Sequence, residues 1–393
     1  MNGTIYMPVG EVCSSISDTY REKKNMVTLI NTSDVLEGRV LNHERVPNSN
    51  LKGQFKKTFQ RDDILYSEIR PQNRRFAYVD FSPIDYIAST KLMVIRAKKD
   101  VVSPKYLYYF LKNSSTVAEL QLLAETRSGT FPQITFSEVA NLTIPVPSLA
   151  VQEVIVQTMQ CLEDKITCNE QINDNLEQQA RAYFQELFVD NADPAWTLGT
   201  ISDLGTVVGG STPSKSKPEY YTEDGIAWIT PKDLSINKAK FISHGENDIT
   251  ELGLKNSSAS IMPEGTVLFS SRAPIGYIAI ASGEVTTNQG FKSVVPKPEI
   301  GTAYVYCFLK HTLPVIEGMA SGSTFKEVSG STMKNVPAVI PDTETLTCFN
   351  EFCAPIFAQQ RILEEQNQSL AALRDSLLPK LMSGELDVSG IQL

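Results

Sequence analysis

Two groups of polar side chains have the types and spacing that base recognition in a nucleic-acid groove requires. In the first, residues 70–75 (Arg-Pro-Gln-Asn-Arg-Arg) follow a predicted strand at residues 63–67 and form the most promising cluster. Arginine can donate two hydrogen bonds to guanine, asparagine or glutamine pairs with adenine, and lysine and hydroxyl groups bind phosphate. The second group follows the corresponding strands in the second half of the chain. The candidate nucleic-acid contacts are Lys52, Lys56, Lys57, Arg61, Ser67, Arg70, Gln72, Asn73, Arg74, Arg75, Thr130, Ser211, Thr212, Lys215, Lys217, Lys232, Ser271, Arg272, Asn288, Gln289, Lys292, Thr324 and Lys326.

Catalytic motifs are missing from the sequence. There is no Gly-x-x-x-x-Gly-Lys-Ser/Thr phosphate loop and no Gly-x-Gly-x-x-Gly after a strand. Residues 193–196 (Asp-Pro-Ala-Trp) lack the second proline of an amino-methyltransferase signature, and we interpret them as a linker. The three histidines are isolated and no Cys-x-x-Cys pair occurs, so we expect no metal site. We expect the chain to catalyse nothing by itself; an enzyme with an active site of unrecognised type is one alternative.

The candidate contacts must be positioned by short strands and helices. Residues 27–30, 63–67 and 76–79 have strand character, and Pro104 marks the first turn of a helix that continues to Lys112. In the second half, residues 227–234 parallel residues 28–35, residues 266–272 parallel residues 63–70, and residues 304–310 parallel residues 106–112. We therefore predict two similar mixed α/β domains in a duplicated chain, with the differences concentrated in polar loops.

Each domain is followed by a long predicted helix of roughly forty residues, and an offset of 194 maps one helix onto the other. Apolar residues recur at alternating intervals of four and three, which is the seam of a coiled coil. The seam residues are Ile155, Met159, Leu162, Ile166, Asn173 and Leu176 in the first helix, and Phe349, Cys353, Ile356, Leu363, Asn367 and Leu370 in the second. Polar seam residues such as Asn173 and Asn367 are known to fix helix register. In an antiparallel pair, Asn169 would lie close to Asn367.

These patterns predict an α+β architecture with pseudo-two-fold symmetry. The predicted parts are a first domain at residues 1–147, a first long helix at 148–190, a second domain at 191–341, and a second long helix with the C-terminal tail at 342–393.

The net charge of −9 is unevenly distributed. Residues 151–190 and 342–393 together carry −11, so the rest of the chain sums to +2. The helices are therefore the acidic surface and favour protein partners, whereas the domains are compatible with DNA. We expect a cytoplasmic protein, because no signal peptide or membrane-spanning stretch is found and the cysteines are interpreted as reduced.

Several segments carry a resemblance to a known family. They are residues 144–149 (Ile-Pro-Val-Pro-Ser-Leu) leading to Gln152, residues 196–199 (Trp-Thr-Leu-Gly), residues 228–234 (Trp-Ile-Thr-Pro-Lys-Asp-Leu) and residues 377–384 (Leu-Leu-Pro-Lys-Leu-Met-Ser-Gly). Along its whole length the chain resembles the specificity subunits of Type I restriction–modification systems. It departs from the family pattern at Ser148, where a second proline is usual, and at residues 149–152, where Glu usually precedes Gln.

The resemblance implies two target-recognition domains that each read one half of a split double-stranded DNA site. It also implies that the helices pack as an antiparallel coiled coil and dock two methyltransferase subunits, with restriction subunits joining this core. S-adenosylmethionine, ATP and magnesium would be bound by those partners and not by this chain.

The helix length independently predicts a split site. Ile155 to Leu187 spans 32 residues, or about 48 Å of helix, which corresponds to about 14 base pairs. The main alternative is a scaffold that binds duplicated protein partners and no DNA, and salt-dependent binding to duplex DNA separates the two hypotheses.

Overall fold

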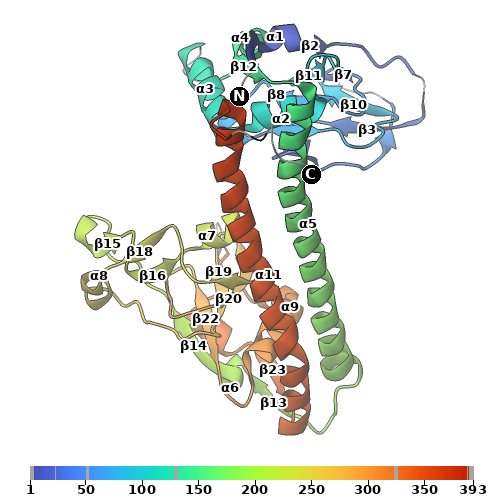
Figure 1. Ribbon diagram of the computed structural model, residues 1–393. Helices are drawn as coiled ribbons and strands as arrows, with labels where there is room; N and C mark the ends of the chain where they lie inside the picture. The colour runs from blue at the N-terminus through green and yellow to red at the C-terminus, as the bar shows by residue number, and fades with distance from the viewer. Residues whose placement is uncertain are drawn as a thin grey trace. The chain divides into compact units, whose positions relative to one another are not determined.

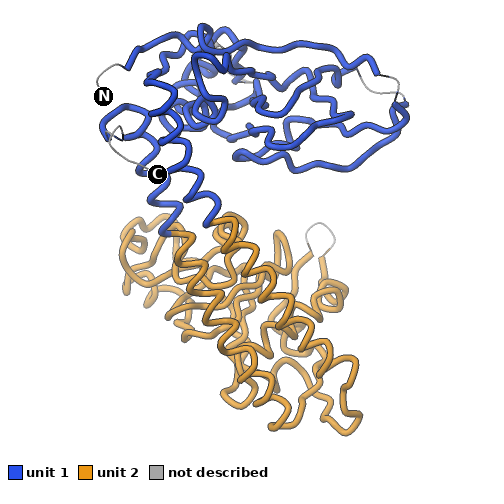
Figure 2. Tube along the Cα trace, turned by 45° about the vertical axis from the view of Figure 1, so that its right-hand side comes forward, with its two compact units in different colours: residues 1–165, 369–393 blue, residues 166–368 orange. Residues whose placement is uncertain are grey.

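The computed structural model of the chain describes residues 4–22, 24–49, 53–127, 132–322, 326–386 and 388. It divides into two compact units (Figure 2), residues 1–165 with 369–393 and residues 166–368. The division runs through both long helices, α5 (Leu149–Gln185) and α11 (Thr343–Ser383). Each unit therefore contains one mixed α/β domain together with a segment of each long helix.

The first unit holds two four-stranded sheets, in the orders β2-β11-β8-β9 and β6-β3-β10-β7, and two two-stranded ribbons, β1-β12 and β4-β5. Its elements are β1 (Ile5–Pro8), α1 (Val9–Val12), β2 (Cys13–Ile16), β3 (Met26–Ile30), η1 (Thr32–Asp34), β4 (Val35–Leu36), β5 (Arg39–Val40), β6 (Val46–Pro47), β7 (Phe55–Lys57), β8 (Ile64–Ser67), η2 (Pro71–Asn73), β9 (Phe76–Tyr78), β10 (Tyr86–Ser89), β11 (Leu92–Ala97), α2 (Pro104–Lys112), α3 (Ser114–Arg127), α4 (Phe136–Asn141) and β12 (Thr143–Val146).

The second unit repeats this plan with a five-stranded sheet, β14-β22-β19-β20-β17, a four-stranded sheet, β15-β18-β16-β21, and the ribbon β13-β23. Its elements are η3 (Glu186–Asp190), β13 (Thr197–Thr200), α6 (Ile201–Leu204), β14 (Gly205–Gly209), η4 (Pro218–Tyr220), β15 (Tyr221–Thr222), β16 (Ile226–Ile229), α7 (Pro231–Ile236), β17 (Phe241–Ile242), β18 (Asn247–Ile249), α8 (Glu251–Lys255), β19 (Val267–Ser271), β20 (Ile275–Ala281), β21 (Thr286–Thr287), β22 (Lys292–Pro296), α9 (Thr302–Gly318), α10 (Gly330–Lys334) and β23 (Pro337–Ile340).

Strand pairing confirms the predicted duplication. In each domain the first strand pairs antiparallel with the last, β1 with β12 and β13 with β23. Each domain also contains a parallel pair at the equivalent place, β3 with β10 and β16 with β21, and the second domain has a further parallel pair, β17 with β20. In each of the two equivalent pairs the strand that comes first in the chain is followed directly by a short helix. β3 is followed by η1 and β16 by α7.

The long helices of 37 and 41 residues match the predicted length (Figure 1). Within the second unit they run antiparallel, because the Tyr183 ring lies against Phe352 with ring centroids 4.4 Å apart, while Asn169 Nδ2 donates to Asn367 Oδ1 at 2.8 Å. Within the first unit, Ile155 and Met159 share a core with Leu378 and Leu381. All of the predicted seam residues are buried or half-buried, as a helix seam requires.

The two polar seam positions behave differently. The predicted approach of Asn169 to Asn367 is confirmed by their hydrogen bond. Asn173, the repeat counterpart of Asn367, instead presents its backbone carbonyl to Gln360 Nε2 at 3.1 Å. The two long helices therefore repeat in kind and position but not in their polar contacts.

Candidate nucleic-acid interface

The second domain brings six of the predicted contact residues into one groove of about 730 Å³. These are Thr212, Lys215, Lys232, Arg272, Asn288 and Gln289, joined by residues that sequence reasoning did not select, among them Tyr221, Trp228 and Asn247. The groove thus combines cationic, amide, hydroxyl and aromatic side chains. That mixture can contact both phosphates and base edges.

Local structure fixes the walls of this groove. Thr230 and Asp233 form a capping box at the start of α7, which sets the direction in which Lys232 leaves the helix. Asn288 Oδ1 accepts from the backbone N–H of Gly290 at 2.8 Å, forming the turn that presents Gln289 to solvent. A Cβ on Gly210 would lie 1.9 Å from the Asn288 carbonyl, so only glycine permits this close approach of two loops.

Carboxylates lie beside the cations of the groove. Lys232 Nζ is 2.5 Å from Glu246, and this hydrogen bond raises the pKa of the exposed lysine. Arg272 and Lys292 both face Glu327, at 3.5 Å and 3.9 Å. Burial lowers the pKa of Lys292, whose Nζ also donates to the carbonyls of Gln289 and Phe291.

Some predicted contacts of the second domain have internal roles. Ser271 is fully buried and donates to the Gly290 carbonyl at 3.0 Å, so it holds the loop and faces no solvent. Lys292 is largely enclosed by its carbonyl partners, which removes it from phosphate contact. Ser211 braces the loop by accepting from Ser258 N and from Trp228 Nε1. Lys217 and Lys326 are exposed outside the groove, Lys217 beside Glu219 at 3.6 Å.

In the first domain, three predicted contacts are engaged in holding its own backbone. Lys57 Nζ donates to the carbonyls of Thr90 and Leu92, and burial lowers its pKa. The buried Ser67 hydroxyl bonds to the backbone of Ile69. Arg75 Nη1 donates to the carbonyl of Ser33 at 3.0 Å. Their geometry indicates that they stabilise loops, because a donor already used in a half-buried bond is costly to withdraw.

The remaining described predictions in the first domain are exposed, and Arg70, Gln72 and Asn73 lie together at the short helix η2. Lys56, Arg61, Arg70, Gln72 and Asn73 lie on the surface. Arg74 lines a pocket of about 300 Å³ together with Lys112 and, on α11, Arg374 and Leu378. The cluster at residues 70–75 therefore splits, with Arg75 turned inward and Arg74 beside the long helix. Lys52, Thr130 and Thr324 lie outside the described residues.

The sequence analysis did not identify two largely buried ion pairs, one in each unit, that join a domain to α5. In the first unit, Lys112 pairs with Glu163, and Tyr109 Oη donates to the same carboxylate at 2.9 Å. In the second unit, Lys240 pairs with Glu177, which also accepts from Tyr306 Oη at 3.2 Å. Burial opposes ionisation of Glu177, but attraction to Lys240 outweighs it and lowers the pKa of that carboxyl.

Further contacts extend the second pair into a network. Lys240 Nζ donates to Gln360 Oε1 at 2.6 Å and lies 3.8 Å from the centroid of the Phe357 ring. Glu364 accepts from the backbone N–H groups of Lys240 and Phe241. The domain thus contacts both long helices through buried, charge-assisted bonds, an arrangement that would give no signal in a sequence pattern.

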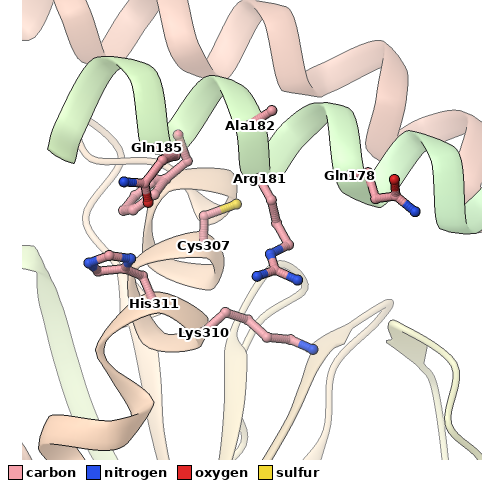
Figure 3. A pocket seen from close by; sticks show the side chains of 8 residues that line it. Gln178, Arg181, Ala182, Gln185, Cys307, Lys310 and His311 are labelled. Atoms are coloured by element: carbon pink, nitrogen blue, oxygen red, sulfur yellow. The ribbon is translucent and has the colours of Figure 1, made fainter. Parts of the chain in front are cut away.

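A second basic pocket of about 280 Å³ lies where α5 meets α9, lined by Arg181, Lys310 and His311 around the Cys307 thiol. Figure 3 shows the Arg181 and Lys310 side chains reaching toward the same side of the pocket from the two helices. Burial raises the pKa of the Cys307 thiol, so this group is not a reactive thiolate.

Neither metal binding nor membrane insertion is indicated within the described ranges. Among those residues, no group of three or more His, Cys, Asp or Glu could hold a metal ion. None of the helices built from them combines the length and apolar character needed to cross a bilayer.

Comparison with known proteins adds the family. A model described as "Type I restriction modification DNA specificity domain" matches residues 6–178 and 195–373. The HindI specificity subunit of Haemophilus influenzae is 30% identical over 92% of this chain and 94% of its own length. The MjaIX specificity subunit of Methanocaldococcus jannaschii is 40% identical over 46% and 44% of the two chains. The solved Type I S subunit from M. genitalium has the same fold, with a TM-score of 0.57 at 16% identity over 98% and 97%.

The family model matches the chain twice, once over each recognition domain and the helix that follows it. This agrees with the duplicated strand order and the two long helices. The family excludes both alternatives considered from the sequence, the protein scaffold without DNA and the enzyme with its own active site. The chain belongs to the family of DNA specificity subunits of Type I restriction–modification systems, and such a subunit is the non-catalytic component that gives the system its DNA specificity.

Proposed function

We propose that this chain reads a split double-stranded DNA target, with one recognition domain per half-site. The observation that carries the proposal is the groove of the second domain, which gathers Thr212, Lys215, Lys232, Asn288 and Gln289 at one surface. Bases differ in the donors and acceptors that they present in the major groove, and this set contains both kinds of partner. The recognition domains are taken as residues 1–147 and 191–341, with spacer segments at 148–190 and 342–393.

We further propose that the paired long helices dock two methyltransferase subunits and that restriction subunits join this core. The support is the distribution of charge. The two helical segments carry a net charge of −11, whereas the rest of the chain carries +2, which gives the total of −9. An acidic helical surface is suited to protein partners and is repelled by DNA. S-adenosylmethionine, ATP and magnesium would be bound by these partners.

Mapping methylated adenines in a genome that carries this subunit and its partners tests the proposal. We expect a motif of two short specified parts separated by unspecified base pairs. One continuous short motif would contradict it. Binding of the purified complex to a duplex bearing the motif should weaken steeply with salt, because lysine and arginine contacts release counterions from phosphates.

A further inference from the structure

Arg272 and Glu327 form a fixed donor–acceptor pair beside the groove of the second domain. Arg272 lines the groove directly after β19, and its Nη1 lies 3.5 Å from Glu327 Oε2. Both side chains are partly exposed, at 37% and 39%. They can therefore reach a ligand without first leaving a buried position.

The backbone holds these two residues side by side. Arg272 and Glu327 form an antiparallel bridge, and the next residue, Val328, donates its N–H to the Ser271 carbonyl at 2.9 Å. On its other side Glu327 exchanges two backbone hydrogen bonds with Ser321. The pair is thus preorganised, which lowers the entropy lost when it engages a ligand.

Lys292 lies near the other oxygen of the Glu327 carboxylate. Its Nζ lies 3.9 Å from Glu327 Oε1, only 16% of its side chain is exposed, and two backbone carbonyls hold it in place. Glu327 therefore faces two cations, Arg272 and Lys292, and one of its oxygens is directed at the guanidinium. The geometry keeps a hydrogen-bond acceptor next to a pair of donors.

This order of groups matches one base pair. Across the major groove, a G·C pair presents two acceptors, guanine N7 and O6, and then the N4 donor of cytosine. An arginine supplies two donors in a fixed fork, and an ionised glutamate supplies only acceptors. An A·T pair presents acceptor, donor and acceptor, so it would place a donor opposite the guanidinium or an acceptor opposite the carboxylate.

We propose that Arg272 and Glu327 together read one G·C base pair in the half-site of the second domain, with Arg272 on guanine and Glu327 on cytosine. The inference rests on the proposed function, since it assigns part of the sequence that this domain recognises. Glu327 thereby becomes a specificity-determining residue, and Lys292 a positioning residue that keeps the carboxylate in line.

The test uses the chain assembled with its methyltransferase subunits. The motif of the natural protein is mapped first, and methylation rates are then measured on duplexes in which each specified base pair is replaced in turn. We expect Glu327→Gln to relax discrimination at a single G·C position by roughly 10-fold, because glutamine both donates and accepts. Arg272→Lys should relax the same position, since an ammonium lacks the planar fork. The other half-site should be unchanged in both variants.

Glu251→Gln is the matched control, because Glu251 lies in the same domain, is 82% exposed and pairs with Lys255 within α8. It should leave every position unchanged. The proposal is overturned if no specified G·C position responds to both variants, or if both variants reduce methylation equally at every position, which would mean that the pair only holds the fold. Failure of the proposed function is distinct, because the natural complex would then show no split motif at all.

Discussion

The two units attach their domains to α5 in the same way and differ in what the domains present to solvent. Each attachment is a lysine of the domain buried against a glutamate of α5, Lys112 with Glu163 and Lys240 with Glu177, and in each a tyrosine donates to the carboxylate. The candidate contacts are arranged differently. The second domain collects six in one groove, whereas the first engages Lys57, Ser67 and Arg75 with its own backbone and leaves Lys56, Arg61, Arg70, Gln72 and Asn73 on its surface.

This difference shows that a basic composition does not by itself gather the candidate contact residues at one surface. Residues 1–150 have an excess of four positive charges, while residues 191–341 have a deficit of two, yet the clustered groove lies in the second segment. What forms the groove is the set of turns at Gly210, Thr230 and Asn288, which direct neighbouring side chains toward one another. The two attachments use the same residue types at different places in the two copies, Lys112 at the end of α2 and Lys240 just before β17, whereas the arrangement of the candidate contacts is particular to each domain.

The largest effect is expected where the units are alike. Lys240→Ala removes the cation beside Glu177 and leaves a largely buried carboxylate without the charge that offsets its burial, which costs about 3 kcal/mol of unfolding free energy. Lys112→Ala should have a similar effect in the first unit. Urea unfolding combined with hydrogen exchange would locate each loss. Lys255→Ala, at an exposed pair, is the control, and a loss no larger than that of the control would break the equivalence of the two attachments.

The next effect tests the difference between the reading surfaces. Gln289→Ala removes an exposed amide from the groove and should weaken discrimination at one half-site by about 1–3 kcal/mol, which is the usual contribution of a base-specific pair. Gln72→Ala removes an exposed amide from the short helix η2 of the first domain, away from the groove of the second domain, and should have a smaller effect confined to the other half-site. Methylation rates on single-position variants of each half-site measure both. Equal losses would show that a shared groove is unnecessary for reading.

A smaller change is expected at Arg75. Its hydrogen bonds to the carbonyls of Ser33 and Val35 link two loops at a partly exposed site, so Arg75→Ala should destabilise the first unit by about 1 kcal/mol and leave the recognised bases unchanged. Arg61→Ala, at an exposed position, is the comparison for charge alone. Thermal unfolding and motif mapping measure the two outcomes. A changed base preference without a change in stability would contradict this prediction and would mean that Arg75 contacts DNA.

The smallest effect on stability is expected for Asn367→Leu. Asn367 accepts a hydrogen bond from Asn169 across the helix seam, whereas its repeat counterpart Asn173 accepts from Gln360 through its backbone carbonyl. Leucine suits a helix seam, but the change removes the hydrogen bond from Asn169. We therefore expect unfolding free energy to shift by less than about 1 kcal/mol, while the number of unspecified base pairs or the uniqueness of helix pairing changes. The double variant Asn169→Leu with Asn367→Leu provides the matched comparison. An unchanged spacing with one unique pairing would show that this pair does not set register.

Much of the framework could be predicted because it rests on repeating patterns. The four-three spacing of residues such as Ile155 and Phe349 identified the helices, and the antiparallel register placed Asn169 against Asn367. The duplicated strands were visible because buried strands keep their apolar residues. The reading surface was harder, since whether Ser271 or Arg75 points outward depends on the path of a loop and not on residue type. The pairs Lys112–Glu163 and Lys240–Glu177 join residues 51 and 63 positions apart, and no local spacing connects them.

The ribbons that open and close each domain have a consequence for how such chains diversify. Ile5 pairs with Val146 and Thr197 pairs with Ile340, so the second domain leaves and rejoins the helical framework at adjacent strands, and the first strand of the first domain lies beside the strand that leads into α5. Neighbouring entry and exit points are the geometry at which one folded insert can replace another without strain. Recombination within the two ribbon sequences would therefore exchange a whole recognition domain in one step, while the helices and whatever they carry stay as they were. New DNA specificities would then arise by shuffling complete inserts as well as by gradual substitution in the loops.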